Sequence, residues 1–261
     1  MNFFLETLKV IVLLVYYFLE SLVFLVVPVR KKNVSGEIVL ITGAGSGIGR
    51  LLAVKFASLG ATVVLWDINQ EGLNCTVGLA KEKGAGRVHS YVCDCSKRQE
   101  IYRVADQTYK AFLPAMIAAN HGHLVSIASV AGLCGVSQAS DYSASKFAAI
   151  GLAESIDMEM RNLRKTGVKT TIVCPFVVNT GLFDGVKSKW PRMLPILDPE
   201  YVVERIISAV RQNQEIVLIP RILYFLLFFK SFLPVKATVL LLDYFGLIVI
   251  MNTFKGRPKK E

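Results

Sequence analysis

The stretch Thr42-Gly43-Ala44-Gly45-Ser46-Gly47-Ile48-Gly49 follows an apolar run over 38–42 and leads into a helical pattern over 49–59. Gly43 allows a tight turn, while Gly47 and Gly49 allow a phosphate and the next helix to come close. The first amides of that helix point toward phosphate oxygens. Because a strand precedes the turn and a helix follows it, we predict dinucleotide binding by Gly43, Ser46, Gly47, Ile48 and Gly49.

The second apolar run, Val63 to Trp66, ends at Asp67, eighteen residues beyond Gly49. A carboxylate at this place accepts hydrogen bonds from the ribose hydroxyls and repels a 2′-phosphate. No basic residue lies inside the turn before Gly49 to attract such a phosphate. We therefore expect Asp67 to bind the cofactor and the cofactor to be NAD rather than NADP.

A second set of polar residues follows the apolar run 124–128. Ser129 ends this run, Tyr142 comes thirteen residues later and Lys146 four residues after that. Tyr142 and Lys146 then share one face of a helix that runs to about Arg164, so the ammonium can lower the pKa of the phenol. We predict Tyr142 as acid and base, Ser129 as the partner of the substrate oxygen, and Lys146 as the group that also holds the nicotinamide ribose.

Strand and helix patterns alternate between these motifs, which predicts an α/β fold with a parallel sheet covered on both faces. In this order the motifs resemble the short-chain dehydrogenase/reductase family, and within it the membrane-bound retinol and 17β-hydroxysteroid dehydrogenases. The resemblance covers residues 36–220, includes the run from Cys174 to Gly181, and implies a Rossmann-like, doubly wound sheet. The tyrosine and lysine would also contact the cofactor.

The resemblance adds three further cofactor contacts. It implies that Asp94 contacts the adenine and that Val178 and Thr180 contact the nicotinamide carboxamide. The residues themselves leave alternatives open, namely a helix cap for Asp94, a core position for Val178 and a turn hydroxyl for Thr180.

The chain departs from the family pattern in its middle. The Asn-Asn-Ala-Gly motif of the fourth family strand is absent, as is the helix asparagine of the catalytic tetrad, and Asp94 is only 35 residues before Ser129. This is short by a strand-helix unit of roughly 30 to 40 residues, with the junction near Gln107-Thr108. The sheet therefore lacks one central strand. It keeps a gap, or it closes and moves Ser129 and Tyr142 by about 4.8 Å.

Two apolar regions flank the central domain, for which we expect residues 33–220. The segment from Phe3 to Val29 ends at Arg30-Lys31-Lys32 and predicts a membrane anchor over 1–32, either spanning or monotopic, with the domain facing the cytosol. The segment 221–261 has a basic tail and is expected to lie on a membrane or to pack back on the domain. The expected location is the endoplasmic reticulum membrane or a lipid droplet.

The composition argues against other classes of site. The net charge of +10 includes the basic residues beside the apolar ends, so it favours membrane flanking over nucleic-acid binding. Five cysteines without a Cys-x-x-Cys pair favour reduced thiols, and no metal site is expected. His121 and His123 are interpreted as turn residues.

Apolar residues between Thr180 and the helix that starts at Asp198-Pro199 predict a core segment or a lid over an apolar substrate, with Phe183 and Trp190 as substrate contacts. The sequence thus leaves two functions. The first is NAD-dependent oxidation or reduction of a lipophilic alcohol or ketone, retinol-like or steroid, in a monomer or a homodimer. The second is a membrane-anchored, catalytically impaired product of exon skipping or of a pseudogene, retaining at most nucleotide binding.

Overall fold

The computed structural model describes residues 3–27, 29–84, 86–94 and 112–256, which divide into two compact units, Met1–Lys32 and Asn33–Glu261. The first unit holds the helix α1 (Phe3–Val26). Within the described ranges, no helix is long and apolar enough to cross a membrane. The N-terminal membrane helix expected from the sequence therefore stays a proposal.

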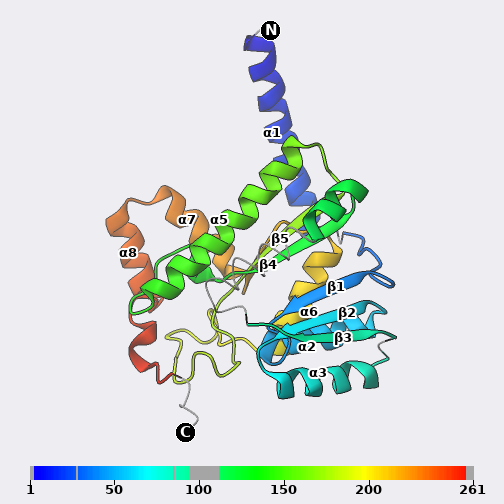
Figure 1. The fold of residues 1–261 in the computed structure, drawn as a ribbon. Helices are drawn as coiled ribbons and strands as arrows, with labels where there is room; N and C mark the ends of the chain where they lie inside the picture. Colours follow the sequence, from blue (N-terminus) through cyan, green and yellow to red (C-terminus); the bar gives the residue numbers. More distant parts are fainter. Residues whose placement is uncertain (1–2, 28, 85, 95–111, 257–261) are drawn as a thin grey trace. The chain divides into compact units, whose positions relative to one another are not determined.

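Among its described residues, the second unit has six parallel strands in two sheets of three (Figure 1). The first sheet has the order β1 (Ile38–Thr42), β2 (Thr62–Asp67) and β3 (Val88–Val92). The second has the order β4 (Gly122–Ile127), β5 (Val168–Pro175) and β6 (Ile216–Ile219). An α/β architecture with parallel strands is therefore confirmed.

Helices connect and cover the strands. They are α2 (Gly47–Ser58), α3 (Gln70–Glu82), α5 (Ser140–Asn162), α6 (Pro199–Arg211), α7 (Ile222–Phe232) and α8 (Val235–Tyr244), with short 3₁₀ turns η1 (Val130–Gly132) and η2 (Ile250–Thr253). Residues 112–119 are also helical. Helices α2 and α3 pack on the first sheet, and α5 and α6 pack on the second.

Local sequence signals explain several of these boundaries. β1 has the bounds expected from its apolar run, and α6 begins as predicted, because the Asp198 carboxylate accepts a hydrogen bond from the Tyr201 amide at 3.1 Å. Pro199 occupies the first helical turn, where its missing N–H costs nothing. The helix with Tyr142 and Lys146 ends at Asn162, two residues before the expected end.

The sheet has a gap between β1 and β4. Within the described part of the chain, each of the two strands pairs with one neighbour, β2 and β5 respectively. Ile38 of β1 is 69% exposed and Val125 of β4 is 39% exposed, whereas Leu65 and Val173 of the neighbouring strands are 0% exposed. A central strand of a parallel sheet is covered on both faces, so this exposure indicates where the strand-helix unit is missing. The junction expected at Gln107-Thr108 lies outside the described residues.

The two sheets nevertheless share one core. Buried residues of the first sheet, such as Val63 and Leu65, belong to the same hydrophobic cluster as Val173 and Val217 of the second. Helix α2 contacts α6 across the sheets. At the amino ends of β1 and β4, the Glu37 carboxylate lies 3.1 Å from the His121 ring nitrogen. These contacts keep the two halves of the domain together without the strand between them.

The C-terminal segment belongs to the second unit. Leu223 and Leu226 of α7 are buried, as are Phe245, Ile250 and Met251 further along the chain. Residues 221–256 therefore pack back on the domain, which is one of the two arrangements expected for this segment. Their outer face is apolar, with Phe225, Phe228 and Phe232 exposed.

Candidate active site

The glycine turn is too tightly packed for larger residues. A Cβ atom at Gly49 would lie 2.1 Å from the Gly43 carbonyl oxygen, and one at Gly45 would lie 2.9 Å from the Asp67 carboxylate. The Gly45 amide donates to Asp67 Oδ2 at 2.8 Å. The carboxylate therefore lies beside the turn, where a nucleotide ribose is expected, and the residues fit a dinucleotide.

Sequence reasoning missed two residues that hold this turn in place. Arg50 Nε donates to Thr76 Oγ1 at 3.1 Å, and another Arg50 nitrogen donates to the Gly45 carbonyl. The fully buried Thr76 hydroxyl donates to the Ala44 carbonyl at 2.8 Å. These bonds hold the Arg50 guanidinium against the turn. The sequence feature that could have identified Arg50 is its position directly after Gly49, the last glycine of the motif.

The structure also brings Thr180, a predicted cofactor contact far away in the sequence, to the turn. Thr180, which follows β5, lies 3.7 Å from a Cβ atom built on Gly47. Ser46 is the N-cap residue of α2 and Ile48 packs against the core. Val178 is buried and forms a bridge with Leu197, which favours a core role, and Asp94 is half-buried just after β3.

Ser129 lies where predicted, at the end of β4, and it is buried. Its hydroxyl accepts a hydrogen bond from the Ala131 amide at 3.2 Å and donates to the Pro175 carbonyl at 3.4 Å. These bonds fix the hydroxyl on the short η1 turn. A fixed hydroxyl is suited to bind an oxygen on which charge develops.

Tyr142 faces the same space from the first turn of α5, and its ring lies 5.3 Å from the Phe183 ring, edge to face. Burial raises the pKa of Tyr142, and a hydrogen bond with Ser129 offsets this only in part. The expected lowering of this pKa by Lys146 was wrong. Lys146 Nζ lies 5.6 Å from the centre of the tyrosine ring and is engaged elsewhere.

Lys146 Nζ donates to the Ile127 carbonyl at 3.0 Å. The backbone amides of Gly122 and Ala128 donate to the carbonyls of Gly167 and Val173. The backbone N–H and C=O groups of even-numbered residues in β4 therefore point toward β5, and the carbonyl of Ile127 points toward the gap. In a complete sheet, this carbonyl would pair with the missing strand. Lys146 therefore satisfies an orphaned carbonyl, which commits one of its donors and holds its side chain at the sheet edge. Burial also lowers the pKa of Lys146.

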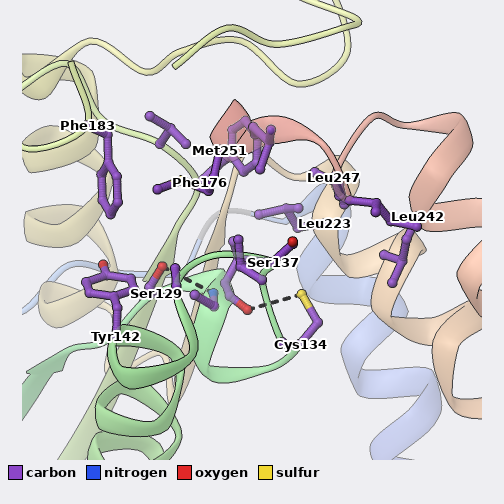
Figure 2. Close-up of a pocket in the computed structure, with 18 residues that line it drawn as sticks. Ser129, Cys134, Ser137, Tyr142, Phe176, Phe183, Leu223, Leu242, Leu247 and Met251 are labelled. Carbon is purple, nitrogen blue, oxygen red and sulfur yellow. Dashed lines mark hydrogen bonds between the residues drawn. The ribbon is translucent and has the colours of Figure 1, made fainter. Parts of the chain in front are cut away.

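An apolar cavity of about 130 Å³ opens next to the two hydroxyls. Figure 2 shows Ser129 and Tyr142 at one end and Leu242 and Leu247 at the other. Phe183 lines this cavity, as predicted for a substrate contact. Trp190 lies apart from it: its indole donates to the Tyr244 carbonyl at 2.8 Å.

Sequence reasoning missed most of the cavity wall. Its far side comes from the C-terminal segment, with Leu223, Leu242, Leu247, Ile250 and Met251. Phe176, directly after Pro175, is also buried against the cavity. The apolar composition of the segment was visible, but nothing in its pattern indicated which side chains turn toward the active site.

The described residues contain no cluster of three metal-ligating side chains. Burial raises the pKa of Cys174 to about 12, so this thiol stays protonated. His121 precedes β4 at the Glu37 contact, and His123, inside β4, bonds the Thr171 hydroxyl at 2.8 Å.

The sequence profile of the family described as short chain dehydrogenase matches residues 37–112 and 107–190. This chain belongs to the short chain dehydrogenase family. Epidermal retinol dehydrogenase 2 of Mus musculus is 50% identical over 286 aligned positions, which cover 93% of each chain. Estradiol 17-beta-dehydrogenase 11 of Homo sapiens is 40% identical and covers 90% of this chain and 91% of its own. The chain thus falls in the retinol and steroid dehydrogenase subgroup.

A solved structure supports the same fold. A short chain dehydrogenase/reductase of Burkholderia phymatum, in complex with NAD, has a TM-score of 0.62 and 25% identity over 74% of this chain and 92% of its own. The length of the mouse alignment fits a missing unit in this short chain dehydrogenase. Since 93% of 261 residues is about 243, about 43 of the 286 positions have no residue of this chain (286 − 243). The two profile segments meet at 107–112, where the junction was expected.

Proposed function

We propose that the chain is an NAD-dependent oxidoreductase of lipophilic alcohols, retinol-like or steroid, whose turnover is impaired by the missing unit. The observation that supports it best is the pair of hydroxyls, Ser129 and Tyr142, at the end of an apolar cavity. An apolar cavity with few convergent polar groups suits a lipophilic alcohol. The names of the retinol and estradiol dehydrogenases among its relatives point the same way.

Each residue has a part in this reaction. NAD, when bound, supplies the hydride acceptor. Ser129 exchanges its hydrogen bond to the Pro175 carbonyl for one to the substrate oxygen, and Tyr142 takes the hydroxyl proton of the alcohol. Asp67 accepts from the adenosine ribose, while the amides of the turn at Ser46 to Gly49 face the pyrophosphate. Thr180, beside Gly47, lies at the nicotinamide end.

A second candidate is a nucleotide-binding protein that does not turn over substrate. Two observations favour it: Lys146 is drawn to the Ile127 carbonyl, and the pKa of Tyr142 is raised by burial. A neutral tyrosine is a poor base, since the phenolate fraction falls tenfold with each pH unit below the pKa. The two candidate functions share cofactor binding and differ in the rate of substrate turnover.

Titration with NADH and NADPH tests nucleotide binding, which both candidate functions require. We expect the unmodified chain to bind NADH more tightly than NADPH. Asp67→Ala should weaken the affinity for NADH about tenfold or more, because the charged hydrogen bonds to the ribose hydroxyls are lost. The same substitution should narrow the difference in affinity between NADH and NADPH. Gly49→Ala should abolish binding of both nucleotides, since its Cβ would overlap the Gly43 carbonyl. Binding is read from nucleotide fluorescence with the full chain in detergent.

Gly78→Ala is the matched control, because a Cβ atom there meets nothing within 4 Å. It should leave both affinities unchanged. Equal affinity for NADH and NADPH in the unmodified chain would contradict the role given to Asp67. Unchanged NADH binding by Gly49→Ala would show that the nucleotide does not bind at this turn.

Membrane attachment is part of the same proposal, with the domain on the cytosolic side of the endoplasmic reticulum or on a lipid droplet. Its support is the exposed apolar surface of α1 and the exposed phenylalanines of α7, of which Phe232 is 72% exposed. We expect the chain to stay with membranes through an alkaline carbonate wash, and removal of residues 1–29 to weaken the attachment. Complete release of the intact chain would argue against it.

A further inference from the structure

Helix α7 has a single charged residue. Its sequence, ILYFLLFFKSF, is apolar except for Lys230 and Ser231. Leu223 and Leu226 face the core, and the Lys230 ammonium donates a hydrogen bond to the Leu133 carbonyl. A charged group on such a helix is costly to bury unless it is hydrogen-bonded, so this contact favours one position of α7.

Leu133 ends the turn that carries Ser129. The Gly132 amide donates to the Ser129 carbonyl and the Leu133 amide donates to the Val130 carbonyl, both at 2.9 Å. The turn is thus braced from within, and Lys230 attaches it to the C-terminal segment. That segment supplies part of the cavity wall, including Leu223, Leu242 and Met251 (Figure 2).

We propose that Lys230 is a positioning residue, which fixes the apolar wall of the substrate cavity onto the Ser129 turn and so sets the affinity for the lipophilic substrate. The proposal rests on the proposed function, because it assigns the cavity to that substrate. Other contacts hold the segment at its rim, between Gln138 and Asn252 at 2.7 Å and between Trp190 and Tyr244 at 2.8 Å. Lys230, in contrast, reaches the turn that carries Ser129.

Cys134 is a native reporter of this contact. Its thiol lines the cavity directly after Leu133 and is buried. Burial raises the pKa of Cys134, while the charge of Lys230 lowers it in part. Removing that charge without moving α7 would make the thiol less reactive. Removing it and releasing α7 would expose the thiol, so the two cases change the reactivity in opposite directions.

The test is alkylation of Cys134 by iodoacetamide in the full chain, read residue by residue by mass spectrometry, with the exposed Cys75 as internal reference. We expect Lys230→Met to accelerate labelling of Cys134 about tenfold, as the loss of one charge-assisted hydrogen bond implies. Lys230→Arg should restore slow labelling. Lys236→Met, which removes an exposed lysine of α8, is the matched control and should change nothing.

Unchanged or slower labelling in Lys230→Met would overturn the proposal, as would equal acceleration by Lys236→Met. If Lys230→Met does not fold, Lys230→Gln serves with the same expectation. A second readout separates positioning from general loosening: the Kd for retinol, from its fluorescence, should rise about tenfold while the Kd for NADH stays within twofold. The labelling needs no ligand, so failure of the unmodified chain to bind retinol would count against the proposed function alone.

Discussion

Insertion of the missing unit at Gln107-Thr108 is expected to raise retinol or steroid oxidation by roughly a hundredfold to ten-thousandfold. The segment of about 43 residues is taken from the mouse epidermal retinol dehydrogenase 2 alignment. The insert would pair with β1 and β4, release Lys146 from the Ile127 carbonyl, and return the relay asparagine that the family resemblance implies. A positioned proton relay contributes about 10²- to 10⁴-fold to a rate. The rate is measured as NADH formation with retinol in detergent.

A glycine-serine insert of the same length is the control, because it lengthens the connection without adding a strand. It should leave the low activity unchanged. If the unmodified chain already oxidises retinol as fast as the restored one, the gap does not limit the chemistry. Lys146 then reaches its catalytic position despite the contact at the sheet edge.

Tyr142→Phe is expected to lower the activity of the restored chain by about 10²- to 10⁴-fold, since it removes the group that takes the alcohol proton. In the unmodified chain the same residue sets the pH dependence. Because the pKa of Tyr142 is raised, the phenolate is scarce at neutral pH, and residual oxidation should increase steadily as the pH rises from 7 to 10. The measurement is the rate against pH at saturating NAD.

Tyr201→Phe provides the matched control, because Tyr201 is exposed on α6. It should keep both the rate and its pH dependence. A plateau of activity near neutral pH in the unmodified chain would show that the phenol has a low pKa after all. Loss of activity in Tyr142→Phe together with loss of thermal stability would point to a structural role of the hydroxyl through its hydrogen bond with Ser129, because phenylalanine keeps the ring that packs on Phe183.

Much of the fold could be predicted because its signals are local. The apolar run into the glycine turn specified β1, and Asp198-Pro199 specified the start of α6. The spacing of Tyr142 and Lys146 also placed both on one helix. These features depend on residues a few positions apart, so the sequence contains them in full.

The remainder depends on contacts between distant segments. Whether the shortened sheet closes or keeps a gap is decided by the packing of α2 on α6 and by the shared core, which no local pattern encodes. The position of Lys146 follows from the same gap, since its partner is a carbonyl that a complete sheet would use. The cavity wall from α7 to η2 lies more than 90 residues from Ser129 in the sequence.

The most direct test of the account is amide hydrogen exchange at β1 and β4 in the unmodified chain, resolved to single residues. The central claim is that both strands are edges facing a gap. In a parallel strand, the backbone N–H and C=O groups of successive residues point alternately to the two neighbouring strands. The Glu37 carbonyl accepts from the Thr62 amide at the start of β2, and the Gly122 amide donates to the Gly167 carbonyl before β5, which shows which residues bond the existing neighbour. The amides of Leu40 and Val125 should therefore exchange about a hundredfold faster than those of Ile41 and Ser126. Equal protection of all four would contradict the gap.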